Sequence, residues 1–140
     1  MNKFDILKAF FIDYLQFYQK QEAFEIEKLN ALLSNELSQI EANILAQQVQ
    51  AKKMEAMEQR REAVVTSLGL SNLTFNQIIL QFEGNQKQQL SDMYQSLSDV
   101  LQNIQYYNRK SMDLIKMNLR LFEPSEKIVS NEYSAHQGSR

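Results

Sequence analysis

The chain has 140 residues, of which 44% are hydrophobic and 23% charged, and its formal net charge at pH 7 is −2. With 3 glycines and 1 proline it lacks the turn residues that β-rich and loop-rich proteins need, so the composition predicts one domain built from a few long helices. The absence of cysteine excludes disulfides and thiolate metal sites, and the small acidic net charge gives no sign of the basic face that nucleic-acid binding needs.

No stretch of the sequence has the length and composition of a membrane span or a signal peptide. The apolar run Ala9–Ile12 stops at Asp13, far short of the roughly 20 residues that cross a bilayer. No basic region leads into a long apolar block with a small-residue cleavage site. We therefore expect a cytosolic protein without stable membrane insertion.

The first long helix is predicted over residues 2–33, where apolar residues recur with helical spacing. They form two lines, one of Phe4, Leu7, Phe11, Tyr14 and Tyr18 and one of Phe10, Phe17 and Phe24. A two-stranded coiled coil needs only one narrow seam. Two lines therefore indicate that this helix packs against two other helices, or against one helix and a partner.

A turn or kink is predicted at residues 34–37, because Ser34 and Asn35 can accept hydrogen bonds from the free N–H groups of a helix start. A continuous helix stays open, since neither residue forbids one. The second long helix is then expected over residues 36–68. Gly69 follows its last apolar residue and suits a helix end in the left-handed conformation.

The second helix is apolar at both ends and polar in its middle. Residues 47–53 contain glutamines and lysines with little apolar pattern, which predicts an under-packed or mobile segment. Glu58 and Arg61 lie at the spacing of neighbours on one helix face and are predicted to form a solvated surface pair.

Two further helices follow. Thr74 can cap a short helix over Phe75–Phe82, which we expect to lie across one end of the bundle. The third long helix is predicted over Leu90–Phe122, where apolar residues alternate at spacings of three and four, and we take it as the element around which the chain is organised. The polar residues Asn108 and Ser111 interrupt its stripe, so this face is either core or a recognition surface.

The predicted domain spans residues 1–122, and residues 123–140 are expected to form a flexible tail. Pro124 ends the helical pattern, and the segment after it has too few apolar residues to bury a core. Tyr133 is its one aromatic residue.

The residues that catalysis commonly requires are missing. The one histidine, His136, lies in the predicted tail, and no pair of histidines or Glu-x-x-His element could hold a metal. The glycines are isolated, so no phosphate-binding loop is present. We therefore predict no enzyme, no cofactor and no metal site, and expect the function to be protein binding.

Two motifs and the order of the helices resemble FlgN-type flagellar export chaperones. The second helix ends in Arg60–Leu70, an arginine-rich apolar stretch that closes in Leu-Gly-Leu as the family pattern does. In its third helix the family tends towards Leu-Asn-x-x-Asn-x-x-Leu-Leu, and residues 104–112 keep Asn108 and a conservative Ile104. The departures from that pattern are Gln105, Ser111 and Met112.

The resemblance implies a cytosolic chaperone for the hook–filament junction proteins, of the FlgK/FlgL type, that keeps them soluble and delivers them to the flagellar type III export gate. It places the client site on the third helix. The implied client-binding residues are Leu97, Leu101, Ile104, Tyr107, Asn108, Ser111, Met112 and Ile115. Tyr133 is a candidate docking point for the export apparatus, beside the plain alternative of an ordinary tail residue.

The expected fold is all-α, an elongated antiparallel bundle or coiled coil of three long helices and one short helix with a disordered C-terminal tail. Two other functions stay open. One is a structural coiled-coil subunit that homo-oligomerises without a client, and a homodimer is compatible with either role. The other is a membrane-associated helical protein, although none of the helices has the Lys/Arg-rich polar face that this mode needs.

Overall fold

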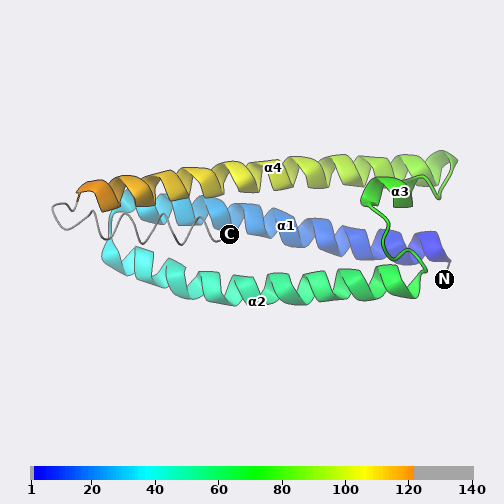
Figure 1. Cartoon of the computed structure of the whole chain (residues 1–140), viewed down its shortest axis with the longest axis horizontal. Coiled ribbons are helices and arrows are strands. Elements are labelled where there is room, and N and C mark those ends of the chain that lie inside the picture. The colour runs from blue at the N-terminus through cyan, green and yellow to red at the C-terminus, as the bar shows by residue number, and fades with distance from the viewer. Residues whose placement is uncertain (1, 122–140) are drawn as a thin grey trace.

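The structure, a computed structural model, describes residues 2–121, with side chains described as far as Asn118. These residues form four helices, α1 (Lys3–Ser34), α2 (Leu37–Ser67), α3 (Phe75–Ile79) and α4 (Gly84–Leu121). The long helices lie side by side in an elongated bundle (Figure 1), and α2 runs antiparallel to both α1 and α4. The predicted fold class is confirmed. The predicted tail with Tyr133 lies outside the described residues.

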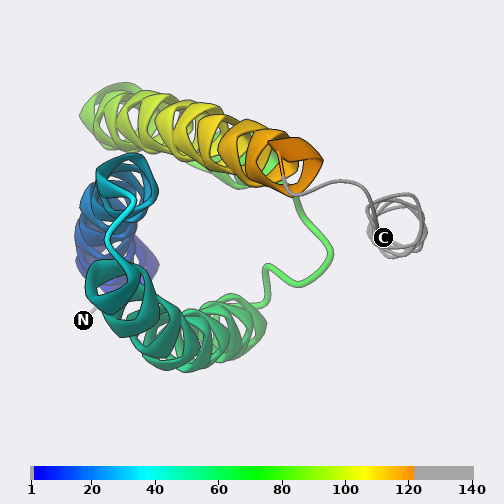
Figure 2. The ribbon, with the colours of Figure 1, turned by 90° about the vertical axis from the view of Figure 1, so that its left-hand side faces the viewer.

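The central helix of the bundle is α1. It contacts both α2 and α4, whereas no Cα atom of α2 comes within 8 Å of a Cα atom of α4 in the described part of the chain. The three helices therefore form an open arc in cross-section (Figure 2). The expectation that residues 90–122 organise the chain is wrong in this respect. The reason is that α1 carries two apolar lines and can be covered by two neighbours at once.

The two apolar lines of α1 reach more than one neighbour, but both of them contact α2, since Tyr14 and Tyr18 of the first line are hydrogen-bonded to Glu58. The ring of Phe11, from the first line, lies 4.3 Å from the ring of Phe75 in α3. The ring of Phe10, from the second line, lies 5.2 Å from the guanidinium carbon of Arg60 in α2.

The most completely buried part of the core lies at the end of the bundle where α3 lies. Leu7 of α1 and Leu90 of α4 have 0% exposure, and Ile78 and Ile79 of α3 are buried with them. A helix of five residues is unstable alone, so α3 depends on this burial. α3 lies beside α4 near this end of the bundle (Figure 1), so the predicted end is right, although α3 covers the side of α4 and does not cross the end.

The helix ends are built largely as predicted. Asn35 adopts a left-handed conformation with φ of 56° between α1 and α2, and Gly69 follows α2 with φ of 72°. These values confirm the turn at residues 34–37 and the glycine at the end of α2. The predicted capping is wrong for Asn35, which is the C-cap of α1, while Glu36 precedes α2 without a side-chain capping hydrogen bond. At the start of α3, Thr74 accepts a hydrogen bond from the backbone N–H of Gln77, and the Gln77 side chain accepts one from the N–H of Thr74.

Two predicted helix bounds are wrong. α3 ends at Ile79 rather than at Phe82, because the chain turns immediately after it. α4 begins at Gly84, well before Leu90. Residues 85–89 are all polar and mostly exposed, so no apolar period marks them as helical although they continue the same helix.

Candidate functional site

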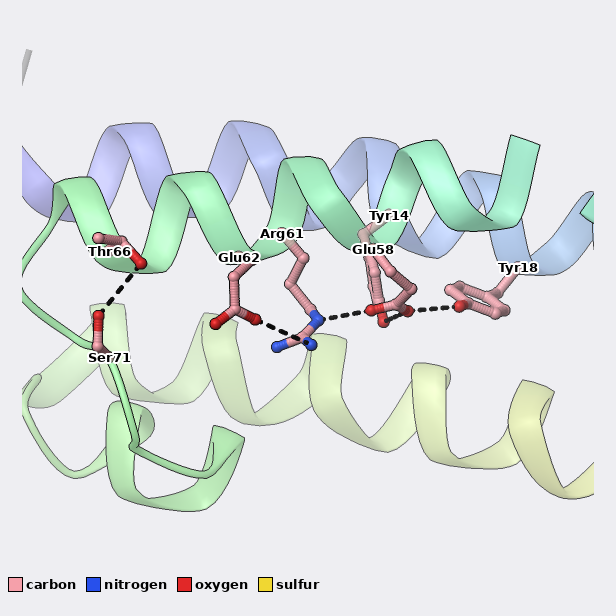
Figure 3. A network of polar contacts seen from close by, with 7 residues as sticks. All are labelled: Tyr14, Tyr18, Glu58, Arg61, Glu62, Thr66 and Ser71. Carbon is pink, nitrogen blue, oxygen red and sulfur yellow. Dashed lines mark hydrogen bonds and ion pairs between the residues drawn. The ribbon is translucent and has the colours of Figure 1, made fainter. Parts of the chain in front are cut away.

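A cluster of four side chains joins α1 to α2 (Figure 3). The hydroxyls of Tyr14 and Tyr18 each donate a hydrogen bond of 2.6 Å to Oε1 of Glu58. The other oxygen of that carboxylate, Oε2, accepts a hydrogen bond of 2.7 Å from Nε of Arg61. We call this set the tyrosine–carboxylate cluster. The predicted pair of Glu58 and Arg61 is present. It is half-buried rather than fully solvated, and its carboxylate also accepts hydrogen bonds from two buried tyrosines.

The pKa values in the cluster favour one state at neutral pH. Burial, and then the hydrogen bond to Glu58, raise the pKa of Tyr14 far above its ordinary value and the pKa of Tyr18 to about 12. Burial also raises the pKa of Glu58, but the hydrogen bonds from both tyrosines and from Arg61 outweigh it and bring the pKa of Glu58 below its ordinary value. The carboxylate is thus ionised while the hydroxyls stay protonated, and all three hydrogen bonds form.

Next to this cluster, a cavity of about 310 Å³ lies between α1, α2, α3 and α4. Its lining is mainly apolar and aromatic, with Phe11, Val65, Leu70, Phe75, Tyr94 and Leu101 among the residues that form it. Arg61 and Glu62 add a polar part (Figure 3). Since one water occupies about 30 Å³ of the liquid, the cavity has room for a large apolar side chain.

Three lines of residues lead away from the cavity along the inner side of the bundle, each repeating every seven residues. They are Leu7, Tyr14, Gln21 and Lys28 on α1; Val65, Glu58, Ala51, Ile44 and Leu37 on α2; and Tyr94, Leu101, Asn108 and Ile115 on α4. Seventh neighbours lie only about 20° apart around a straight helix. Over the three or four repeats of a line this adds up to about 60–80°, so each line stays on one half of its helix.

Three apolar residues on these inner lines are exposed, although Leu7 and Val65 on the same lines are buried. Leu101 is 38% exposed, Ile44 50% and Leu37 70%. A closed bundle would bury such positions. Here α2 and α4 do not contact each other in the described part of the chain, and the exposure of these three side chains shows that the inner side is accessible. We call this surface, from the cavity to Leu37, the open side.

Polar contacts occupy the middle of the inner side. Nζ of Lys28 donates a hydrogen bond of 2.9 Å to Oδ1 of Asn108 and forms an ion pair of 2.7 Å with Glu25. Nε2 of Gln21 donates a hydrogen bond of 3.4 Å to the other oxygen of Glu25. Of these contacts, the one between Lys28 and Asn108 joins α1 to α4, at an exposed position, whereas the other two lie within α1.

Part of the predicted client-binding set lies on the open side. Leu97 and Leu101 line the cavity. Asn108 and Met112 border a shallow hollow of about 400 Å³ further along α4. The spacings of four, seven and four place these residues on one face of the helix.

The other four residues of the predicted set are buried or half-buried. Ile104 packs against the core, and Ser111 is 1% exposed. Tyr107 and Ile115 are half-buried. A client could not contact Ser111 without separating α4 from α1, so the accessible part of the predicted site is smaller than the sequence indicates.

Sequence reasoning missed the tyrosine–carboxylate cluster and the contribution of α2 to the open side. One signal was present, because Tyr14 and Tyr18 fall in a core line and buried tyrosine hydroxyls usually find a hydrogen-bond partner. Glu58 shares a seven-residue line with Val65, which identifies it as that partner once α1 and α2 are known to pair.

The geometry is that of a helical protein with an open, partly apolar side, and comparison with known proteins assigns its family. The family described as FlgN protein matches residues 1–134. The chain belongs to the FlgN family. No curated protein and no solved structure matches this FlgN chain.

FlgN proteins are flagellar export chaperones, and the family is not known for enzymatic activity. No described helix of this FlgN protein is long and apolar enough to cross a membrane. Within residues 2–121, no group of three or more His, Cys, Asp or Glu side chains could hold a metal ion. The candidate functional site of this FlgN protein is therefore the open side with its cavity.

Proposed function

We propose that this FlgN protein is a cytoplasmic chaperone of hook–filament junction proteins of the FlgK/FlgL type, which binds a terminal helical segment of its client on the open side. Before assembly the apolar face of such a segment has no partner and would promote aggregation. The chaperone covers that face, keeps the client soluble and delivers it to the flagellar export gate. The proposal rests on the family and on the geometry of α4.

The observation that carries this proposal is the position of Leu101. Its side chain is 38% exposed, lines an apolar cavity and lies on the predicted client-binding face of α4. Amphipathic helices are commonly recognised by hydrophobic grooves through apolar anchors spaced three, four and seven residues apart. A specific complex needs about 1,000 Å² of buried surface or more, which a helix lying along α4 can supply. Release then requires only competition for the same face.

The proposal is tested with a purified C-terminal segment of a FlgK-type protein from the same organism. We expect a 1:1 complex in gel filtration. Leu101→Asp should abolish the complex, because it places a charge at the cavity. Met117→Asp is the matched control, since Met117 is 56% exposed and lies on the opposite face of α4. The Met117→Asp variant should still form the complex. A complex that tolerates Leu101→Asp and not Met117→Asp would refute the assigned face.

The segment after residue 122 is assigned a separate role, contact with the export apparatus through Tyr133. Truncation after Phe122 should leave client binding unchanged and reduce secretion of the client. Tyr133→Ala in the full chain should reduce secretion in the same way. Secretion at the wild-type level from both variants would remove this part of the proposal.

Homo-oligomerisation without a client is the competing function, and light scattering of the purified chain separates the two. The chaperone proposal predicts a species that binds the client segment whatever its oligomeric state. A stable oligomer that binds no junction-protein segment, and loses its assembly on Leu101→Asp, would favour the structural role instead.

A further inference from the structure

The end of α2 that lies furthest from the cavity has an unusual distribution of side chains. In this half of α2, the residues that face α1 across a hollow are small or polar. They are Gln39, Ala42, Asn43 and Ala46. The large apolar residues Leu37, Ile44, Leu45 and Val49 are instead 50% to 70% exposed. An amphipathic helix packed for its own core has the opposite arrangement. Clustered exposed apolar residues are typical of surfaces that bind a partner.

Two of these residues, Leu37 and Ile44, belong to the inner line of α2 that begins at Val65 in the cavity. The cavity and Ile44 are thus the two ends of one surface. They are separated by about 30 Å, since Val65 and Ile44 are 21 residues apart at 1.5 Å per residue. Between them the inner lines are polar or small, with Gln21, Ala51 and Asn108. The open side therefore offers two apolar ends and a polar middle.

The edges of the open side carry opposite charge. On α2, the seven-residue line beside the inner line is Glu41, Gln48, Glu55 and Glu62. On α4, the corresponding line is Gln95, Gln102, Arg109 and Lys116. Glu62 lines the cavity, and Arg109 and Lys116 line the hollow beside Asn108, so these edge residues adjoin the proposed site. Flanking charges of this kind set the orientation and choice of partner in helix pairs.

We propose that the open side receives one amphipathic helix of the client as a fourth helix of the bundle, along both α2 and α4. Its large apolar anchor enters the cavity, and a second apolar group, about 20 residues away, contacts Ile44 and Leu37. Its basic flank faces α2 and its acidic flank faces α4. This rests on the proposed function and adds to it the contribution of α2, the length of the segment and its charge pattern.

The main experiment uses thiol protection, because the chain has no cysteine and any introduced one is unique. Ile44→Cys and Leu45→Cys are compared, since the two adjacent residues are both exposed but point about 100° apart. The probe is a synthetic C-terminal peptide of a FlgK-type protein from the same organism. We expect the peptide to slow the reaction of Ile44→Cys with a maleimide by about tenfold or more, as burial in a specific complex requires, and to leave Leu45→Cys unchanged.

The other possible occupants give different results in the same experiment. Protection of Ile44→Cys in the free monomer would mean that the chain covers its own open side. Protection that rises with protein concentration would mean a second copy. Either result overturns the proposal. A peptide that binds without protecting Ile44→Cys also overturns it and leaves the proposed function intact, whereas a failure of all junction-protein segments to bind contradicts the proposed function itself.

The cavity and the edges are tested by affinity measurements with the same peptide. Leu101→Trp fills the cavity without adding charge and should weaken binding about tenfold, or roughly 1.4 kcal/mol. Ser71→Trp closes it from the loop and is the alternative if the first variant is unstable. Arg109→Glu should weaken binding, while its neighbour Lys110→Glu, on the far face, should not. If neither Leu101→Trp nor Ser71→Trp changes the affinity, the client does not place an apolar anchor in the cavity.

Discussion

Tyr14 of α1 and Glu58 of α2, 44 residues apart in sequence, are joined by a hydrogen bond of 2.6 Å. Tyr14→Phe removes the hydroxyl and keeps the ring. We expect the free energy of unfolding to fall by about 1–2 kcal/mol, toward the low end for bonds to a charged group because Glu58 is partly solvated. Urea denaturation measures the change. Tyr106→Phe, at an exposed position, is the control and should stay within about 0.5 kcal/mol of wild type.

The same cluster predicts two limits to stability as pH changes. Because the pKa of Glu58 is lower in the folded chain than in the unfolded chain, its stabilising effect is present above its ordinary pKa and is lost as pH falls through the folded value. Because the pKa of Tyr18 is raised from 10.0 to about 12, its effect is present below pH 10 and is lost as pH rises towards 12.

Variants assign each limit to its residue. Glu58→Gln lacks the titrating group, so its difference in unfolding free energy from wild type should shrink as pH falls through the folded pKa of Glu58. The difference between wild type and Tyr18→Phe should shrink in the same way as pH rises towards 12. Urea titrations at intervals from about pH 2 to 12 provide the data, because both windows lie within that range. An acid limb that is identical in wild type and Glu58→Gln would show that other carboxylates cause it.

The packing at the α3 end predicts a large difference between two leucines. Leu90 is 0% exposed, and Leu90→Ala should lower the free energy of unfolding by about 2–5 kcal/mol through lost burial and an unfilled cavity. The matched control is Leu80, which is 67% exposed. Leu80→Ala should change the free energy of unfolding by less than about 0.5 kcal/mol. Thermal and urea unfolding of both variants provide the comparison. Similar losses in the two would place the core elsewhere.

Ser111 predicts a gain in stability from a conservative change. Its side chain is 1% exposed, and its Oγ has no hydrogen-bond partner among the described residues. Ser111→Ala removes an unmatched buried hydroxyl and should raise the free energy of unfolding by about 1 kcal/mol, leaving client affinity unchanged. Weaker client binding by this variant would instead put Ser111 in the recognition surface.

A glycine is favoured at position 69 because of its backbone conformation, and not because a larger side chain would clash with its neighbours. Its φ is +72°, and no atom lies within 4 Å of the position that a Cβ would occupy. Gly69→Ala should cost about 1 kcal/mol because left-handed backbone disfavours a Cβ. Gly69→Asn should cost less, since asparagine tolerates this conformation. Equal losses in both variants would point to a steric cause.

The helices could be predicted because their signals are local. The two apolar lines of α1, the turn after it and the left-handed Gly69 follow from spacing and backbone chemistry within a few residues. The start of α4 could not be predicted, because residues 85–89 are helical without facing a core. Apolar periodicity reports which side of a helix is buried, and a polar, exposed turn has none.

The candidate site could be predicted only on α4. Leu97, Leu101, Asn108 and Met112 form a recognisable stripe, whereas the cavity depends on residues from four helices and on the loop between α2 and α3. The sequence shows that this end of α2 is apolar, but it does not show that Ile44 is exposed, because a pattern indicates an apolar face without specifying the neighbour that covers it.

The separation of α1 from α4 along the chain has a consequence for synthesis. Glu22 and Asn103 are hydrogen-bonded across α1 and α4 although 81 residues separate them. At about 5–20 residues per second on the ribosome, the side of α1 that α4 will cover stays bare for several seconds after α1 itself has emerged. Because such non-local contacts form late, the newborn FlgN chain passes through a stage with an uncovered apolar helix. Its own biogenesis thus carries the hazard that an export chaperone exists to suppress.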